Sequence, residues 1–145
     1  MPVALLDVNV LVALFDPNHI HNKPAHTWFA ANRSRGWATC PVTENALIRI
    51  LSNVSYSSSP ESGERLRRRL AESCADAGDH LFWADSISLR DERFDLSGVS
   101  HRQLSDYYLL QLAVENRGLL ATFDGRMRNV PYARAHLNAL FIIPS

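Results

Sequence analysis

The sequence is poor in cysteine and has no long apolar run near its N-terminus. Its two cysteines, Cys40 and Cys74, lie 34 residues apart and form no CxxC pair. Because this spacing is not typical of a disulfide scaffold or a zinc finger, we expect a reduced, cytoplasmic protein. The longest apolar stretch in the N-terminal region covers residues 10–15. It is too short to span a membrane or to form the core of a signal peptide.

The sequence also lacks an excess of charge of either sign. It contains 15 basic and 15 acidic residues, so its formal net charge is zero. This balance argues against a strongly basic nucleic-acid coat protein, and any bound nucleic acid must be held by local positive charge. Lys23 is the only lysine, and it does not follow a glycine. A P-loop nucleotide-binding site is therefore excluded.

The length and the order of apolar segments predict one α/β domain over residues 1–145. The chain has 145 residues, of which 46% are hydrophobic, enough for a single core. Short apolar runs alternate with helical patterns, which is typical of a mostly parallel central sheet flanked by helices. We expect five strands, at residues 3–6, 37–40, 80–84, 119–122 and 140–143. We expect helices at residues 8–15, 23–32 and 61–77. Another helix is expected to run from an N-cap at Thr43 to residue 52, and a last one from a capping box formed by Ser100 and Gln103 to residue 116.

Acidic residues follow three of the expected strands. Asp7 comes directly after the first strand, Glu44 comes four residues after the second, and Asp124 comes two residues after the fourth. Ligands of an open parallel sheet bind beyond the carboxyl ends of its strands, so these carboxylates are predicted at one edge. Asp106 differs because it lies early in a helix among apolar neighbours, where an unpaired carboxylate is costly.

Four carboxylates without a nearby lysine can share a site only if cations neutralise them. Carboxylate oxygens favour Mg²⁺ or Mn²⁺, and such ions activate water and stabilise the oxygens of a phosphodiester during hydrolysis. This pattern predicts a metal-dependent nuclease. The alternative interpretation is that the acids are helix caps and surface charges, which also stabilise helix N-termini.

Four segments resemble PIN-domain ribonucleases, and in particular the VapC toxins of bacterial type II toxin–antitoxin pairs. They are LLDVNVLVALF, CPVTENALIRILSN, QLSDYYLLQLA and LLATFDGRM, and they occur in the family's order and spacing over nearly the whole chain. The resemblance implies a PIN-like fold with a five-stranded parallel sheet. It also implies an acidic site that binds one or two Mg²⁺ or Mn²⁺ ions, formed by Asp7, Glu44, Asp106 and Asp124.

The same resemblance implies further properties. Asn9 and Thr122 match supporting polar residues of the family. The implied activity is endonucleolytic hydrolysis of RNA to a 5′-phosphate and a 3′-hydroxyl. The implied partners are an RNA substrate, a second copy of the chain in a homodimer, and a cognate antitoxin whose C-terminal tail enters the groove.

Two other functions are weighed against this one. A haloacid-dehalogenase-like phosphatase needs a D-x-D motif and a catalytic lysine, but position 9 is Asn9 and Lys23 lies in the wrong segment. A non-catalytic PIN-fold module that binds RNA or a protein partner is expected to lack a site carboxylate, and none is missing. Arg126 and Arg128 follow Asp124 closely, so we predict that they contact the RNA backbone.

Overall fold

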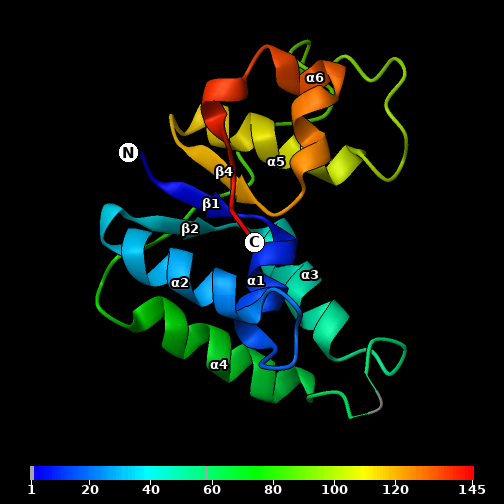
Figure 1. Cartoon of the computed structure of the whole chain (residues 1–145). Helices are drawn as coiled ribbons and strands as arrows, with labels where there is room; N and C mark the ends of the chain where they lie inside the picture. The colour runs from blue at the N-terminus through cyan, green and yellow to red at the C-terminus, as the bar shows by residue number, and fades with distance from the viewer. Residues whose placement is uncertain (1, 58) are drawn as a thin grey trace.

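The computed structural model describes residues 2–57 and 59–145, and its centre is one sheet of five parallel strands (Figure 1). The strand order is β3-β2-β1-β4-β5, and every neighbouring pair is parallel. The strands are β1 (Ala4–Leu6), β2 (Trp37–Thr39), β3 (His80–Phe82), β4 (Leu119–Thr122) and β5 (Leu140–Ile142). Parallel neighbours need crossover connections, which the intervening helices supply. The predicted α/β class is confirmed, and the sheet is parallel throughout.

Helices cover both faces of the sheet. The face that carries α1 (Val8–Phe15), α2 (Asn22–Asn32), α3 (Pro41–Leu51) and α4 (Gly63–Ala75) is opposite the face that carries α5 (Leu104–Glu115) and α6 (Pro131–Arg134) (Figure 1). Successive strand side chains point to opposite faces. Accordingly Leu6 packs into the apolar cluster beneath α1, while Leu5 packs into the cluster beneath α5. No helix in residues 2–57 or 59–145 is long and apolar enough to cross a membrane.

Several helix boundaries differ from those predicted. The N-cap of α3 is Cys40, not Thr43, because Pro41 is suited to the first helical position, where no amide hydrogen is needed. The Thr43 hydroxyl instead accepts a hydrogen bond from the Cys40 amide at 3.0 Å. The predicted bond between the Ser100 amide and the Gln103 side chain is present at 3.0 Å, but it closes a turn, and α5 begins after it at Leu104.

The strand order creates a switch point at the first strand. From β1 the chain continues to β2 on one side and later returns to β4 on the other. The Asp7 amide donates to the Ala121 carbonyl oxygen at 2.9 Å, so the ends of β1 and β4 are joined where Asp7 begins the next helix. In open α/β sheets, such a switch point is the usual position of a ligand site.

Candidate metal-binding site at the sheet edge

Asp7 lies at the carboxyl end of β1 with only 4% of its surface exposed. Its backbone is extended and it is the N-cap of α1, so its side chain accepts a hydrogen bond from the Val8 amide at 2.7 Å. Burial raises the pKa of Asp7, and hydrogen bonds from Thr122 and Val8 oppose this rise. A buried carboxylate at this position costs free energy unless positive charge compensates it.

The Thr122 hydroxyl is hydrogen-bonded to three polar groups at or near Asp7. It donates to the Asp7 carboxylate at 2.7 Å and accepts hydrogen bonds from the Asn9 side-chain amide at 3.0 Å and from the Asp124 backbone amide at 3.1 Å. The Asn9 side-chain oxygen accepts in turn from the Phe123 amide at 3.2 Å. One hydroxyl donates once and accepts twice, so Thr122 is fully satisfied. Asn9 and Thr122 therefore lie beside Asp7, and their supporting role stays a prediction.

Asp106, in the first turn of α5, lines the same cavity as Asp7. Burial, followed by repulsion from Asp7 and Asp124, raises the pKa of Asp106 to about 7, while Arg126 opposes this shift. Burial, followed by the negative charges of Asp106, Asp124 and Asp7, raises the pKa of Tyr132 to about 12. Asp7, Asp106 and Asp124 are hereafter called the acidic cluster.

A cavity of about 510 Å³ opens beside Asp7 and Asp106. It is also lined by Asn45 and Arg49 from α3 and by the exposed carboxylate of Asp85. Asp85 was not among the site residues predicted from the sequence. Its position is nevertheless similar to those of Asp7 and Asp124, because it follows a strand, β3, by three residues. In this structure its carboxylate accepts a hydrogen bond from the Tyr108 hydroxyl at 2.6 Å.

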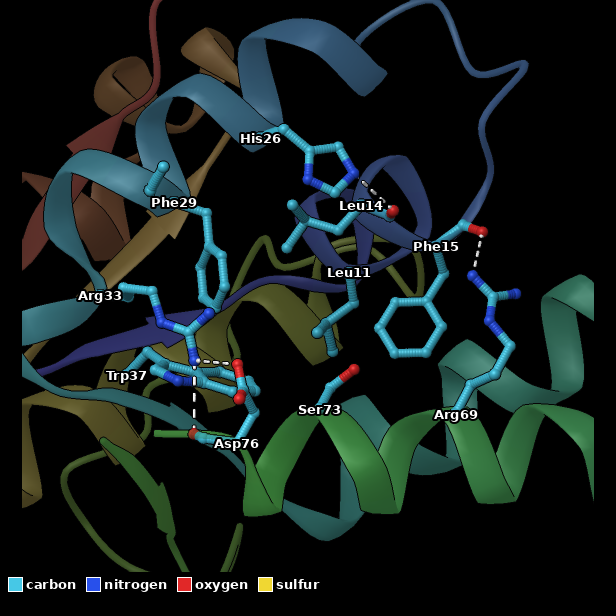
Figure 2. Close-up of a pocket in the computed structure, with 11 residues that line it drawn as sticks. Leu11, Leu14, Phe15, His26, Phe29, Arg33, Trp37, Arg69, Ser73 and Asp76 are labelled. Carbon is cyan, nitrogen blue, oxygen red and sulfur yellow. Dashed lines mark hydrogen bonds and ion pairs between the residues drawn. The ribbon is translucent and has the colours of Figure 1, made fainter. Parts of the chain in front are cut away.

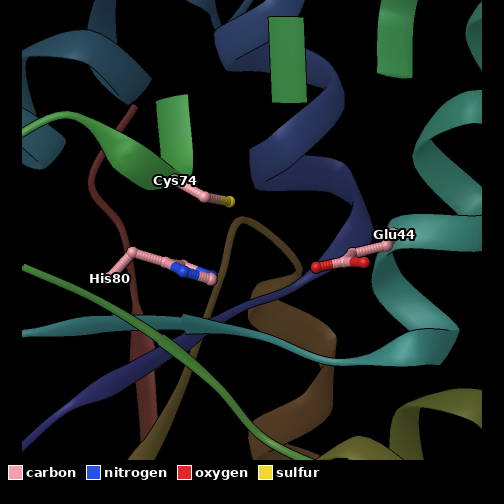
Figure 3. Close-up of side chains that lie close together, drawn as sticks. All are labelled: Glu44, Cys74 and His80. Carbon is pink, nitrogen blue, oxygen red and sulfur yellow. The ribbon is translucent and has the colours of Figure 1, made fainter. Parts of the chain in front are cut away.

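Glu44 does not point into this cavity, although its neighbour Asn45 does. Its carboxylate accepts a hydrogen bond from the Thr39 hydroxyl at 2.7 Å and lies close to Cys74 and His80 (Figure 3). The sequence placed all four acids in one site. The structure brings three of them together and directs the fourth towards the end of β2.

Arg126 and Arg128 lie in the short turn of 3₁₀ helix that follows Asp124. The Arg126 side chain is 93% exposed, and its Nε lies 3.0 Å from the Asp124 carboxylate. Arg128 is exposed on the same turn. Both are therefore accessible to a substrate that approaches the acidic cluster, and their binding of RNA stays a prediction.

A second cavity, of about 470 Å³, lies between α1, α2 and α4, away from the acidic cluster (Figure 2). Phe15, Phe29 and Trp37 form much of its lining. Its two arginines already have partners, since Arg33 pairs with Asp76 at 3.3 Å and Arg69 donates to the Phe15 carbonyl oxygen at 2.7 Å. Its other charged or titratable side chains are engaged too, because Nε2 of His26 lies 3.0 Å from the Leu14 carbonyl oxygen and Asp76 is the partner of Arg33.

The donor chemistry of the acidic cluster fits a hard divalent cation. Its potential ligand atoms are oxygens and are partly buried, and burial together with the repulsion from Asp7 and Asp124 raises the pKa of Asp106. Mg²⁺ keeps several water ligands and binds through one or two carboxylates, so closely packed ligands are not needed. The sheet, its switch point and this cluster define a PIN-like α/β protein with a candidate divalent-metal site.

Comparisons with known proteins agree with this class. Ribonuclease VapC39 of Mycobacterium tuberculosis is 42% identical over 126 residues, which cover 86% of this chain and 90% of that protein. Ribonuclease VapC38 of the same organism is 43% identical over 122 residues, covering 84% and 85%, and ribonuclease VapC29 is 34% identical over 142 residues, covering 97% and 96%. No protein-family model matches the sequence. The chain belongs to the VapC ribonuclease family, which confirms the resemblance that its motifs indicated.

Proposed function

We propose that this protein is a divalent-metal-dependent endoribonuclease and the toxin of a toxin–antitoxin pair. The observation that carries the proposal is the gathering of Asp7, Asp106 and Asp124 at the sheet switch point: Asp7 and Asp106 line one cavity, and Thr122 bonds both the Asp7 carboxylate and the Asp124 amide. Burial and the repulsion among these carboxylates raise the pKa of Asp106. Such an arrangement is unfavourable without a cation. Its similarity to proteins named ribonuclease VapC supports RNA as the substrate.

We assign binding of Mg²⁺ or Mn²⁺ to Asp7, Asp106 and Asp124. When bound, the ion supplies positive charge for the phosphodiester oxygens and lowers the pKa of a water molecule. The hydrogen bonds of Thr122 and Val8 hold the Asp7 carboxylate in one orientation before any ligand arrives. We leave Glu44 out of this ligand set because its carboxylate accepts from Thr39 instead.

The proposed activity is tested with purified, metal-stripped protein and an end-labelled single-stranded RNA. We expect internal cleavage after addition of Mg²⁺ or Mn²⁺, and loss of cleavage when EDTA is added. Cleavage that continues undiminished in EDTA would contradict the metal assignment. RNA binding without cleavage would support the non-catalytic alternative, and metal-dependent hydrolysis of a small phosphate monoester in place of RNA would support the phosphatase.

Replacing both Arg126 and Arg128 with alanine is expected to weaken RNA binding and its dependence on salt. Each lost phosphate contact lowers the slope of log K against log salt by about 0.7 for single-stranded nucleic acid. The measurement is a fluorescence-anisotropy titration at several salt concentrations, with an Arg65→Ala/Arg68→Ala variant as a matched control on the exposed face of α4. An unchanged slope with normal affinity would show that these arginines do not bind RNA.

We further propose that the protein acts in the cytoplasm as a homodimer and is inhibited by a cognate antitoxin. Two free cysteines agree with a reducing compartment. The similarity to VapC toxins supports both the homodimer and the antitoxin partner. Light scattering of the purified protein measures the oligomeric state, and a monomer at all concentrations tested would contradict the dimer.

A further inference from the structure

Three potential metal ligands from three different elements surround Thr39 at the end of β2. They are Glu44 from α3, Cys74 from α4 and His80 from β3, and one ligand atom of each lies within 4.8 Å of the others (Figure 3). All three residues are half-buried. Among the residues that the structure describes, this is the one group of three or more such side chains that meets this distance. We call it the Thr39 cluster.

The Thr39 cluster is separate from the acidic cluster. Trp37 packs into the apolar cluster beneath α1, and Cys74 packs against the same cluster from α4. Thr39 follows Trp37 by two residues on the same strand, so its side chain points to that face too. The acidic cluster, by contrast, includes a residue of α5, on the opposite face of the sheet.

The donor set of the Thr39 cluster is the one that zinc prefers. Sulfur, imidazole nitrogen and carboxylate oxygen together are typical Zn²⁺ ligands, whereas Mg²⁺ favours oxygen alone. Ligand atoms in a tetrahedral zinc site lie about 3.5 Å apart, as follows from metal–ligand distances of about 2.0–2.3 Å. Atoms already within 4.8 Å of one another therefore need only small side-chain rotations to reach this geometry.

The hydrogen bonds around Thr39 hold two of these ligands in place. Its hydroxyl donates to Glu44 at 2.7 Å, and its oxygen lies 2.8 Å from Nε2 of His80. Burial lowers the pKa of His80, which favours the neutral ring, the form that has a lone pair for a metal. Burial and the charge of Glu44 raise the pKa of Cys74 to about 11, so a bound cation must displace the thiol proton to solvent.

We propose that Glu44, Cys74 and His80 bind one Zn²⁺ ion, with water or the Thr39 hydroxyl as the fourth ligand. Three protein ligands with one remaining position are sufficient for zinc. The ion links α3, α4 and β3, three elements from separate stretches of the chain. It therefore stabilises the folded state, and the stabilisation grows with the logarithm of the free Zn²⁺ concentration once this exceeds the dissociation constant. This site is separate from the proposed nuclease site, because the two proposed ligand sets share no residue.

The test uses reduced, metal-stripped full-length protein titrated with Co²⁺, a spectroscopic substitute for Zn²⁺. We expect a near-ultraviolet charge-transfer band from a cobalt–thiolate bond, at one Co²⁺ per chain, and its loss when Zn²⁺ is added. Cys74→Ser should remove the band and weaken Zn²⁺ binding by more than about 100-fold, which exceeds the effect of losing an outer-shell partner. His80→Gln should weaken Zn²⁺ binding in the same direction.

Cys40→Ser is the matched control, because Cys40 is the other cysteine of the chain and serine is a favourable N-cap at its position. It should keep the band, and so should Asp106→Asn, which alters the acidic cluster alone. Circular dichroism establishes that each variant is folded. The proposal is overturned if the folded wild-type protein shows no thiolate band, or if folded Cys74→Ser retains it. Neither result bears on RNA cleavage, which is measured separately with Mg²⁺ or Mn²⁺.

Discussion

Asp7→Asn is expected to abolish RNA cleavage while leaving the protein folded. Asp7 accepts hydrogen bonds from Thr122 and Val8 in the proposed metal site, so its carboxylate is held in place before a cation binds. Loss of even an outer-shell partner lowers metal affinity or activity 10–100-fold, and loss of a direct ligand should lower the cleavage rate by more than about 100-fold. Single-turnover cleavage of labelled RNA at saturating Mn²⁺ measures this change.

The effect of Asp7→Asn on stability should be small. Asparagine remains a good N-cap for α1, and removal of a buried charge offsets the weakened hydrogen bond to Thr122. We expect the melting temperature of the metal-free protein to change by no more than about 4 °C, which corresponds to about 1 kcal/mol in a domain of this size. Glu72→Gln, on the exposed surface of α4, is the charge-matched control and should retain full activity. An unfolded Asp7→Asn protein, or one with wild-type cleavage, would show that the assigned role is wrong.

The second large effect is a dependence of stability on pH that reverses when metal is added. The pKa of Asp106 is about 7 in the folded protein and near 3.8 when the carboxyl is unperturbed. Between these values the folded state binds more protons than the unfolded state, so the free energy of unfolding falls as pH rises from about 4 to about 7. Without metal, Asp106 therefore stabilises the protein least at pH 8.

A divalent cation should invert this trend because it binds the ionised carboxylate. Mn²⁺ competes with the proton on Asp106, so its affinity, and the rise in melting temperature that it causes, should increase from pH 5 to pH 8. Thermal unfolding at both pH values, with and without Mn²⁺, measures both trends. Asp106→Asn should flatten the metal-free pH dependence and remove most of the Mn²⁺ effect. A wild-type protein whose Mn²⁺ stabilisation is equal at pH 5 and pH 8 would contradict Asp106 as a ligand.

Much of the fold follows from local patterns in the sequence. The helix at 8–15 and the strand at 119–122 have the predicted bounds, because apolar periodicity and flanking polar residues specify them locally. The positions of Asp7 and Asp124 after buried strands placed both at one sheet edge, since parallel strands end together. Asp106 was recognisable because a carboxylate among leucines needs a compensating charge. The metal-binding roles of these residues remain predictions.

Other features depend on how the elements pack. Adjacent residues on a helix point about 100° apart, because 3.6 residues complete a turn. A small rotation of α3 about its axis therefore decides whether Glu44 or Asn45 faces the cavity. Strand-end spacing carries no such information, and this explains why Glu44 was grouped with the other acids.

Contacts between residues far apart in the chain could not be predicted from the sequence either. The Thr122 hydroxyl meets Asp7 across 115 positions, and His80 meets Thr39 across 41. The sequence by itself determined the α/β class, the strands and three of the acids at one edge. Only the tertiary structure decided which polar groups share a site, because the direction of a side chain is set by packing between elements that no local pattern encodes.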